Sequence, residues 1–418
     1  MTTAFLRVAR GGLVAPLWRS RRQPWNVDPL RAVHILMDPK LRDVDKLQIE
    51  LRTTQLSLAE AFDLCDAISR VRRRGVAVSA HTFRLDLAHL LAISGAAVRS
   101  SSSLSGPIRA GLALGHLDLA RALSALGIRV NAAISGPAKS QAVLVDPDGL
   151  SAAARDSEAL WLSATLNLVL RIIADQLGHQ LRPGDVIPTG AEAVRMGLLS
   201  YLSDSSPAPV GQALESLPCA EHIAVRRIHP SHLARASGLR TTLRGLIECA
   251  HNDAIGAIVI VLEASGLATS LADRWWSVVR SLGHTKPVVS YARLATSGGL
   301  LPLVSGTRAI ANPLARIGAA GAVAYEVDRS SIPFWTSVQT PPGGVSAQGS
   351  LQRRADIAAG LLIARIAEAR SLDDAQRARV GQGALMTARE AYECGLVDRI
   401  GSISTAIEVA RGLAQITY

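Results

Sequence analysis

The chain has 418 residues, a formal net charge of +11 and 48% hydrophobic residues. This length predicts two or three domains with cores of their own, which excludes a small scaffold held together by a metal or by disulfides. The four cysteines form no C-x-x-C pair, so they indicate neither a zinc ribbon nor a disulfide framework, and we expect buried free thiols. They are Cys65, Cys219, Cys249 and Cys394.

Residues 1–30 are predicted to form a basic amino-terminal arm. Trp18 and Trp25 flank the arginines of LWRSRRQPW, a composition typical of segments that rest on an anionic membrane surface. A second basic stretch, RVRRRG, is interpreted as a solvated helix face, and we expect no nucleic-acid partner. No uncharged apolar run reaches the ~18 to 20 residues of a membrane span, and no clear signal peptide is present. The expectation is a cytoplasmic or peripherally membrane-associated protein.

Residues 31–202 and 213–418 are predicted to be two copies of one α/β domain. TGAEAVRMGLLSYL resembles TAREAYECGLVDRI, and GVAVSAHTFRLDLAHLLAISG resembles KPVVSYARLATSGGLLPLVSG. The Ser-, Pro- and Gly-rich residues 203–212 between the copies are typical of a linker. Short β-branched runs alternate with helical patterns in each copy, which predicts parallel sheets with crossover helices.

Lys139, in the first copy, is a candidate general base. It lies in AAISGPAKSQAVLV, among small and apolar residues, and is one of only four lysines among 45 basic residues. Desolvation lowers the pKa of a lysine, whereas an arginine stays charged. The residues alone leave a second interpretation open, in which Lys139 lies in a surface loop.

Ser297, in the second copy, stands in YARLATSGGLLPLVSG between a strand-like run and a helix-like run. A serine here either caps the helix or acts as a nucleophile, and a nucleophile needs a nearby base. No histidine shares a motif with Ser297, and the G-x-S-x-G elbow is absent. The first copy has Asp86 at the matching position, 211 residues earlier, while the second copy has no lysine around residues 336–339. Each copy therefore keeps one member of a possible Ser–Lys dyad.

The motifs resemble the duplicated bacterial type of the signal peptide peptidase A, or protease IV, family. KPVVSYARLATSGG places Ser297 where the family has its nucleophile, and GPAKS places Lys139 where the family has its base. TAREAYECGLVDRIG matches the carboxy-terminal motif of the family. The resemblance extends over about residues 30 to 415.

The resemblance implies a serine endopeptidase built from two tandem crotonase-like (ββα superhelix) domains that arose by internal duplication. Ser297 would be the nucleophile, Lys139 the general base, and backbone amides near Gly266 and Gly298 the oxyanion donors. The implied substrates are extended apolar peptides such as signal peptides, and the implied assembly is a homo-oligomer, a tetramer. No metal or organic cofactor is implied.

Two motifs depart from the family pattern. EASGL has Leu267 in place of a second glycine, and IGAAG lacks a hydroxyl that can orient the lysine in the family. Two alternatives follow: a catalytically weakened homologue that acts as a binding or scaffold protein, and an acyl-CoA enzyme of the crotonase type. Asp398, in GLVD, is interpreted as a capping or ion-pairing residue.

Overall fold

The computed structural model describes residues 2–9, 26–38, 41, 43–103, 105–116, 119–139, 149–203, 212–213, 223–228, 236–328 and 347–416. The chain divides into two compact units. Unit 1 comprises Met1–Leu112, Thr165–Glu221 and Gly401–Glu408, and unit 2 comprises Ala113–Ala164, His222–Ile400 and Val409–Tyr418. Most of the predicted arm, most of the predicted linker and the segment around residues 336–339 lie outside the described residues.

Unit 1 is built on a parallel sheet with strand order β10-β1-β3-β4-β5-β9, in which β2 also pairs with β1. A short antiparallel pair, β6 and β8, is separate from this sheet. The strands are β1 (Thr3–Val8), β2 (Asn26–Val27), β3 (Lys46–Leu51), β4 (Ala77–Thr82), β5 (Val98–Ser101), β6 (Ile108–Arg109), β8 (Val186–Ile187), β9 (Tyr201–Leu202) and β10 (Gln212–Ala213). Its helices are α1 (Pro29–Leu36), α2 (Leu58–Arg73), α3 (Leu87–Ser94) and α6 (Gly190–Arg195).

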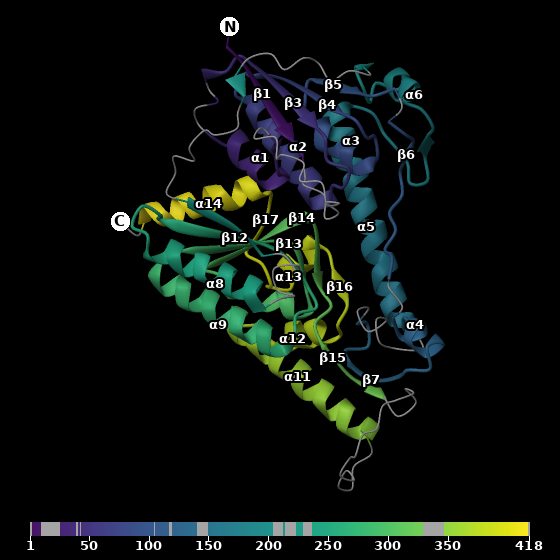
Figure 1. Ribbon diagram of the computed structural model, residues 1–418, viewed down its shortest axis with the longest axis vertical. Helices are drawn as coiled ribbons and strands as arrows, with labels where there is room; N and C mark the ends of the chain where they lie inside the picture. The colour runs from purple at the N-terminus through teal and green to yellow at the C-terminus, as the bar shows by residue number, and fades with distance from the viewer. Residues whose placement is uncertain are drawn as a thin grey trace. The chain divides into compact units, whose positions relative to one another are not determined.

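Unit 2 has a central sheet with strand order β11-β12-β13-β14-β16, and β17 also pairs with β14 (Figure 1). The first four of these strands run parallel, and β16 runs antiparallel to β14. They are β11 (Ile223–Ile228), β12 (Ala257–Ser265), β13 (Val288–Thr296), β14 (Arg308–Gly318), β16 (Leu385–Met386) and β17 (Arg399–Ile400). A second, two-stranded sheet pairs β7 (Arg129–Ser135) with β15 (Ala322–Asp328).

Most helices of unit 2 share one hydrophobic core with β12 and β13. Helices α8 and α9 run alongside each other beside the central sheet (Figure 1). The helical elements are α4 (Leu119–Ala125), α8 (Ala236–His251), α9 (Thr269–Thr285), the 3₁₀ turn η3 (Ser297–Gly299), α10 (Leu300–Val304), α11 (Ala347–Arg370), α12 (Asp374–Gly381) and α13 (Ala388–Glu393). Helices α5 (Ala152–Leu177) and α14 (Ile403–Ile416) have residues in both units.

The α/β class predicted from the sequence is confirmed, and the reason is visible in the strands. The first six residues of β12 and of β13 are all buried, as expected for parallel strands covered by helices on both faces. In each unit a strand, a helix and a strand follow one another at the predicted repeat, with α3 after β4 and α10 after β13. The crotonase-like assignment, the duplication and the boundary at 203–212 stay predictions. The thiols of Cys65, Cys249 and Cys394 are free and buried, as expected.

Helix α5 is the long apolar helix of the part of the chain that the structure describes. It has 26 residues and contains a window of mean hydropathy 1.3, so by length and composition it is able to cross a membrane. Only 33% of that window is buried. A core helix of a soluble protein passes the same test, so this single helix is weak evidence for a membrane span.

Asp398 has the structural role that the sequence predicted. Its carboxylate accepts hydrogen bonds from the Ala309 N–H at 2.7 Å and from the Arg370 guanidinium at 2.7 and 3.2 Å. Burial by itself raises the pKa of Asp398, but these hydrogen bonds outweigh it and hold the pKa below its usual 3.8. The carboxylate therefore ties the end of α11 to the start of β14.

Replacing Asp398 by Asn should lower the free energy of unfolding by about 1 to 2 kcal/mol at neutral pH. The lowered pKa means that this stabilisation is complete above pH 3.8 and is lost as the pH falls through the pKa of the folded state. Urea unfolding at pH 7 and near pH 3 measures both effects, with the exposed Asp374→Asn as control. An equal loss at both pH values would contradict the role of the charge.

Candidate active site

Ser297 stands at a sharp turn between a strand and a helix. Strand β13 ends at Thr296, the 3₁₀ turn η3 begins at Ser297, and α10 follows directly. Ser297 has φ +56°, in the left-handed region, which costs a residue with a Cβ roughly 1 to 2 kcal/mol. Such strain is maintained only where the surrounding structure holds it in place. The N-cap positions of η3 and α10 are Thr296 and Gly299, and neither has a side-chain cap hydrogen bond, so Ser297 is not the capping residue of this helix start.

The two glycines after Ser297 allow the turn to lie directly against the end of β12. A Cβ on Gly298 would lie 2.7 Å from the Leu267 carbonyl oxygen, and a Cβ on Gly299 would lie 2.5 Å from the Ala264 carbonyl oxygen. Both distances are shorter than van der Waals contact with backbone atoms allows. The sequence TSGG therefore brings the serine turn against the loop that follows β12.

A β-bulge interrupts the regular pairing of β13 near its carboxyl end. The pairing with β12 shifts at Arg293, and on the other side the pairing jumps from Ala292↔Ala311 to Leu294↔Arg316. The Arg293 side chain is buried and forms an ion pair with Glu263 at 2.9 Å. Bulges of this kind bend a strand locally and often occur next to functional sites.

Lys139 reaches Ser297 through the pairing of β7 with β15. The end of β13 pairs with the end of β14, at Thr296↔Gly318. After a three-residue turn the chain continues as β15, whose Ala322 pairs with Ser135 at the end of β7. Lys139 follows β7 by four residues, and its N–H donates to the Gly136 carbonyl. The antiparallel pairing thus places the loop with Lys139 beside the end of β13.

The structure brings Lys139 and Ser297 into direct contact. The Nζ of Lys139 lies 2.8 Å from the Oγ of Ser297, although the residues are 158 apart in sequence. Lys139 is only 4% exposed and Ser297 only 7% exposed. Burial lowers the pKa of Lys139 from 10.5 to about 8. At pH 7 about a tenth of the amines are therefore neutral, and the neutral fraction grows as the pH rises through 8.

The second contact of the lysine amine is a backbone carbonyl. Nζ lies 2.9 Å from the carbonyl oxygen of Ala319, which has φ +49° in the turn between β14 and β15. Ala319 belongs to IGAAG, the motif whose missing hydroxyl was counted as a departure from the family pattern. In this structure the carbonyl of Ala319 orients the amine. No sequence pattern predicts this contact, because every residue has a carbonyl.

The backbone amides beside Ser297 differ in part from those expected. The Gly266 N–H donates to the Thr296 carbonyl at 3.3 Å, so it is engaged in the backbone and is not available to an oxyanion. The N–H groups of Leu267 and Gly298 have no hydrogen-bond acceptor among the residues that the structure describes, and both residues line the cavity at Ser297. Sequence reasoning treated Leu267 only as a departure from the family pattern, since backbone amides carry no residue signature.

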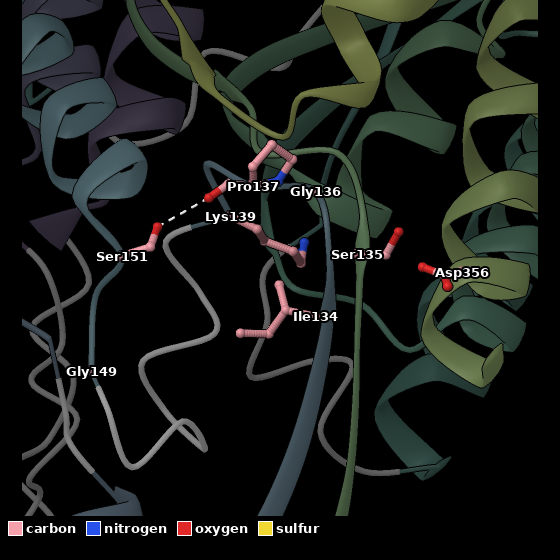
Figure 2. Close-up of a pocket in the computed structure, with 8 residues that line it drawn as sticks. All are labelled: Ile134, Ser135, Gly136, Pro137, Lys139, Gly149, Ser151 and Asp356. Carbon is pink, nitrogen blue, oxygen red and sulfur yellow. Dashed lines mark hydrogen bonds between the residues drawn. The ribbon is translucent and has the colours of Figure 1, made fainter. Parts of the chain in front are cut away.

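A cavity of about 600 Å³ opens in front of the dyad. Lys139, Ser297, Gly298 and Leu267 form one part of its wall, and small apolar side chains of β15 and α11 form much of the rest. A second pocket, of about 370 Å³, also has Lys139 in its wall (Figure 2). Ser151 lines this second pocket and donates a hydrogen bond to the Pro137 carbonyl at 3.0 Å, and Asp356 projects into it from α11 (Figure 2). The lysine thus lies where two pockets meet.

Comparison with known proteins supports the family resemblance. A family profile described as Peptidase family S49 matches residues 345–417. This range contains the motif Thr387–Gly401 but neither Ser297 nor Lys139. The serine protease SPPA, chloroplastic, from Arabidopsis thaliana is 25% identical over 177 residues, which are 38% of this chain. The match spans about a quarter (26%) of the length of that relative.

Solved structures with a partial likeness include both peptidases and an acyl-CoA enzyme. The 1510-N membrane-bound stomatin-specific protease, in complex with a substrate peptide, has a TM-score of 0.30, 17% identity and coverage of 43% of this chain and 75% of its own. A ClpP1 variant from Listeria monocytogenes has a TM-score of 0.30 and 11% identity, and the match covers 43% of this chain and 90% of the ClpP1 chain. A probable enoyl-CoA hydratase/isomerase from Mycobacterium abscessus has a TM-score of 0.31, 18% identity and coverage of 48% and 73%.

Replacing Lys139 by Met should stabilise the protein at neutral pH, because the native state then no longer buries an amine that prefers to be charged. The lowered pKa corresponds to about 3 kcal/mol of unfavourable burial. The unfolded state binds more protons between pH 8 and 10.5, so the wild type regains stability as the pH rises through this window. Thermal unfolding at pH 7 and near pH 10 measures the difference. The exposed Lys46→Met should show no such dependence, and a destabilised Lys139→Met at pH 7 would contradict the prediction.

Proposed function

We propose that this protein is a serine peptidase in which Ser297 is the nucleophile and Lys139 is the general base. One observation carries the proposal: a desolvated lysine amine lies 2.8 Å from the hydroxyl of a serine on a strained strand-to-helix turn. A serine becomes an effective nucleophile when an adjacent base takes its proton, and a desolvated lysine is suited to this role at accessible pH. The match to Peptidase family S49 favours the same activity.

The proposed reaction is acyl transfer in two halves. Neutral Lys139 accepts the hydroxyl proton of Ser297 while Oγ attacks the peptide carbonyl carbon. The N–H groups of Leu267 and Gly298 donate to the oxyanion, where preorganised amides contribute most. The Lys139 ammonium then gives its proton to the leaving amine as the C–N bond breaks. This leaves the acyl group as an ester on Ser297 Oγ. In the second half, Lys139 accepts a proton from water as the water oxygen attacks the ester carbon. Lys139 then gives this proton to Oγ as the C–Oγ bond breaks and the carboxylic acid product leaves.

The cavity favours extended, apolar peptides as substrates. Its β15 wall is formed by Ala322, Val323, Ala324 and Tyr325, and a strand is a template along which an extended peptide binds. The wall from α9 and α11 adds small and apolar side chains, among them Ala272 and Leu362. Signal-peptide-like segments, as the family resemblance implies, have this character.

The arrangement around the site is proposed from the same resemblance. It comprises two crotonase-like domains from a duplication, a homo-oligomer that the family resemblance suggests is a tetramer, and contact of the amino-terminal arm with an anionic membrane surface. Light scattering of the purified protein measures the mass of the assembly. Flotation with anionic vesicles measures the membrane contact.

Replacing Ser297 by Ala should reduce kcat/KM for an apolar peptide by at least about 10³-fold. Lys139→Arg should have a similar effect, because arginine keeps the charge but cannot lose its proton. Lys286→Arg, which alters another lysine of unit 2 outside the cavity, is the matched control. A serine-directed activity probe should label the wild type and not Ser297→Ala. Full activity of Lys139→Arg would contradict the base assignment.

The activity should rise with pH and level off above an apparent pKa of about 8, because Lys139 acts as a base only when it is neutral. Among the residues that the structure describes, the other charged groups that line the two pockets are Arg354 and Asp356. Measurement of kcat/KM between about pH 6 and 10 tests this dependence, with circular dichroism at each pH to verify folding. A profile without a rise between pH 7 and 9 would count against Lys139 as the base.

A further inference from the structure

Helix α11 presents one face to the cavity at Ser297. Arg354, Ala358 and Leu362 are spaced four residues apart on this face, and Ala355 lies beside them. Side chains at this spacing share one side of an α-helix. The face therefore places a charged side chain at one end of an otherwise small and apolar strip.

Arg354 differs in charge from the rest of the cavity wall. Apart from Lys139, whose pKa is lowered, it is the only charged side chain among the described residues that line the cavity. Arg354 is exposed and has no ion pair within the described part of the chain. Elsewhere on the same helix the half-buried Arg365 pairs with Glu368 and Asp273. The guanidinium of Arg354 is thus unneutralised and faces the space in front of the dyad.

The adjoining pocket carries the opposite charge. Asp356, two residues beyond Arg354 on α11, lines the second pocket that also has Lys139 in its wall (Figure 2). Its carboxylate accepts a hydrogen bond from Gln352 at 3.0 Å, and Gln352 also donates to the Ile134 carbonyl at 3.1 Å. Among the described residues, Arg354 lines only the cavity that contains Ser297, and Asp356 lines only the adjoining pocket.

The position of Arg354 along the cavity follows from its neighbours. Ala355 packs in one cluster with Ala133, against which Ala324 of β15 also lies. Ala324 is three residues beyond Gly321, at the dyad end of the cavity. At about 3.3 Å per residue, an extended peptide beside β15 reaches this level about three residues from the scissile bond.

We propose that Arg354 selects peptides with a carboxylate about three residues from the bond that is cleaved. This inference rests on the proposed peptidase function and specifies its substrate class: apolar segments bounded by an acidic group. The carboxylate belongs either to an Asp or Glu side chain or to the carboxyl terminus of the peptide. Both offer two oxygens to the planar fork of a guanidinium.

The test compares matched apolar peptides that carry Glu, Gln or Lys at that distance, and peptides with a free or an amidated carboxyl terminus. The wild type should cleave the carboxylate member of a pair about 5-fold faster in kcat/KM, as expected for one partly exposed ion pair. Arg354→Gln should abolish the preference, and Arg354→Glu should reverse it in favour of Lys. Arg353→Gln, on the same helix but outside the cavity, is the control and should retain it. The pair that responds identifies the source of the carboxylate.

Equal rates for both members of every pair with the wild type, or an unchanged preference in Arg354→Gln, would overturn the inference while the peptidase function stands. Absence of any Ser297-dependent hydrolysis would instead refute the proposed function. In that case the charge preference is measured by fluorescence anisotropy with labelled peptides bound to Ser297→Ala. Equal Kd values for the Glu and Gln peptides would overturn the inference there, and tighter binding of the Glu peptide that Arg354→Gln removes would support it.

Discussion

The site depends on the removal of one lysine amine from water. In solvent, an amine with a pKa of 10.5 is protonated almost completely near neutral pH, and beside a serine it does no more than donate a hydrogen bond. At Lys139, burial lowers the pKa to about 8, and the described contacts of Nζ are two neutral oxygens. No described carboxylate neutralises the ammonium, so the environment stabilises the neutral form more than water does. Burial of the amine thus lowers the stability of the folded protein and, by the same desolvation, allows Lys139 to accept a proton.

The surrounding fold of unit 2 supports this contact from two sides. A parallel sheet provides the strained serine turn, and the glycine pair Gly298–Gly299 allows that turn to lie against the end of β12. A separate two-stranded sheet provides the lysine, because β15 pairs with β7 just before Lys139. The turn between β14 and β15 joins the two sheets and supplies the carbonyl of Ala319. Backbone pairing thus places the loop that carries Lys139, and a backbone carbonyl accepts a hydrogen bond from its amine.

The elements near the serine follow closely from local sequence patterns. The β-branched run before Ser297 is β13, the apolar run after it is α10, and the small residues between them form the turn. The pairing of Lys139 with Ser297 came from a comparison of two halves of the chain and from a family resemblance, because no local pattern encodes a contact across 158 residues. The backbone N–H and carbonyl groups of the site could not be predicted from residue types, because every residue except proline has both. Gly266 was predicted as an oxyanion donor, but its N–H donates to the Thr296 carbonyl. The apolar side chains of Leu267 and Ala319 give no indication that their backbone groups contribute to the site. Arg354 was missed because one more arginine in a chain with 45 basic residues carries no signal of its own.

The antiparallel pair of β7 and β15 also has a consequence for biosynthesis. Lys139 leaves the ribosome long before Ser297, and β15 is made after both. Until β15 is translated and has paired with β7, the amine and the hydroxyl lie on separate segments of the nascent chain. The β7–β15 pairing that places them side by side has not yet formed. The proposed hydrolytic chemistry therefore stays latent during synthesis and begins only when this part of the chain has folded.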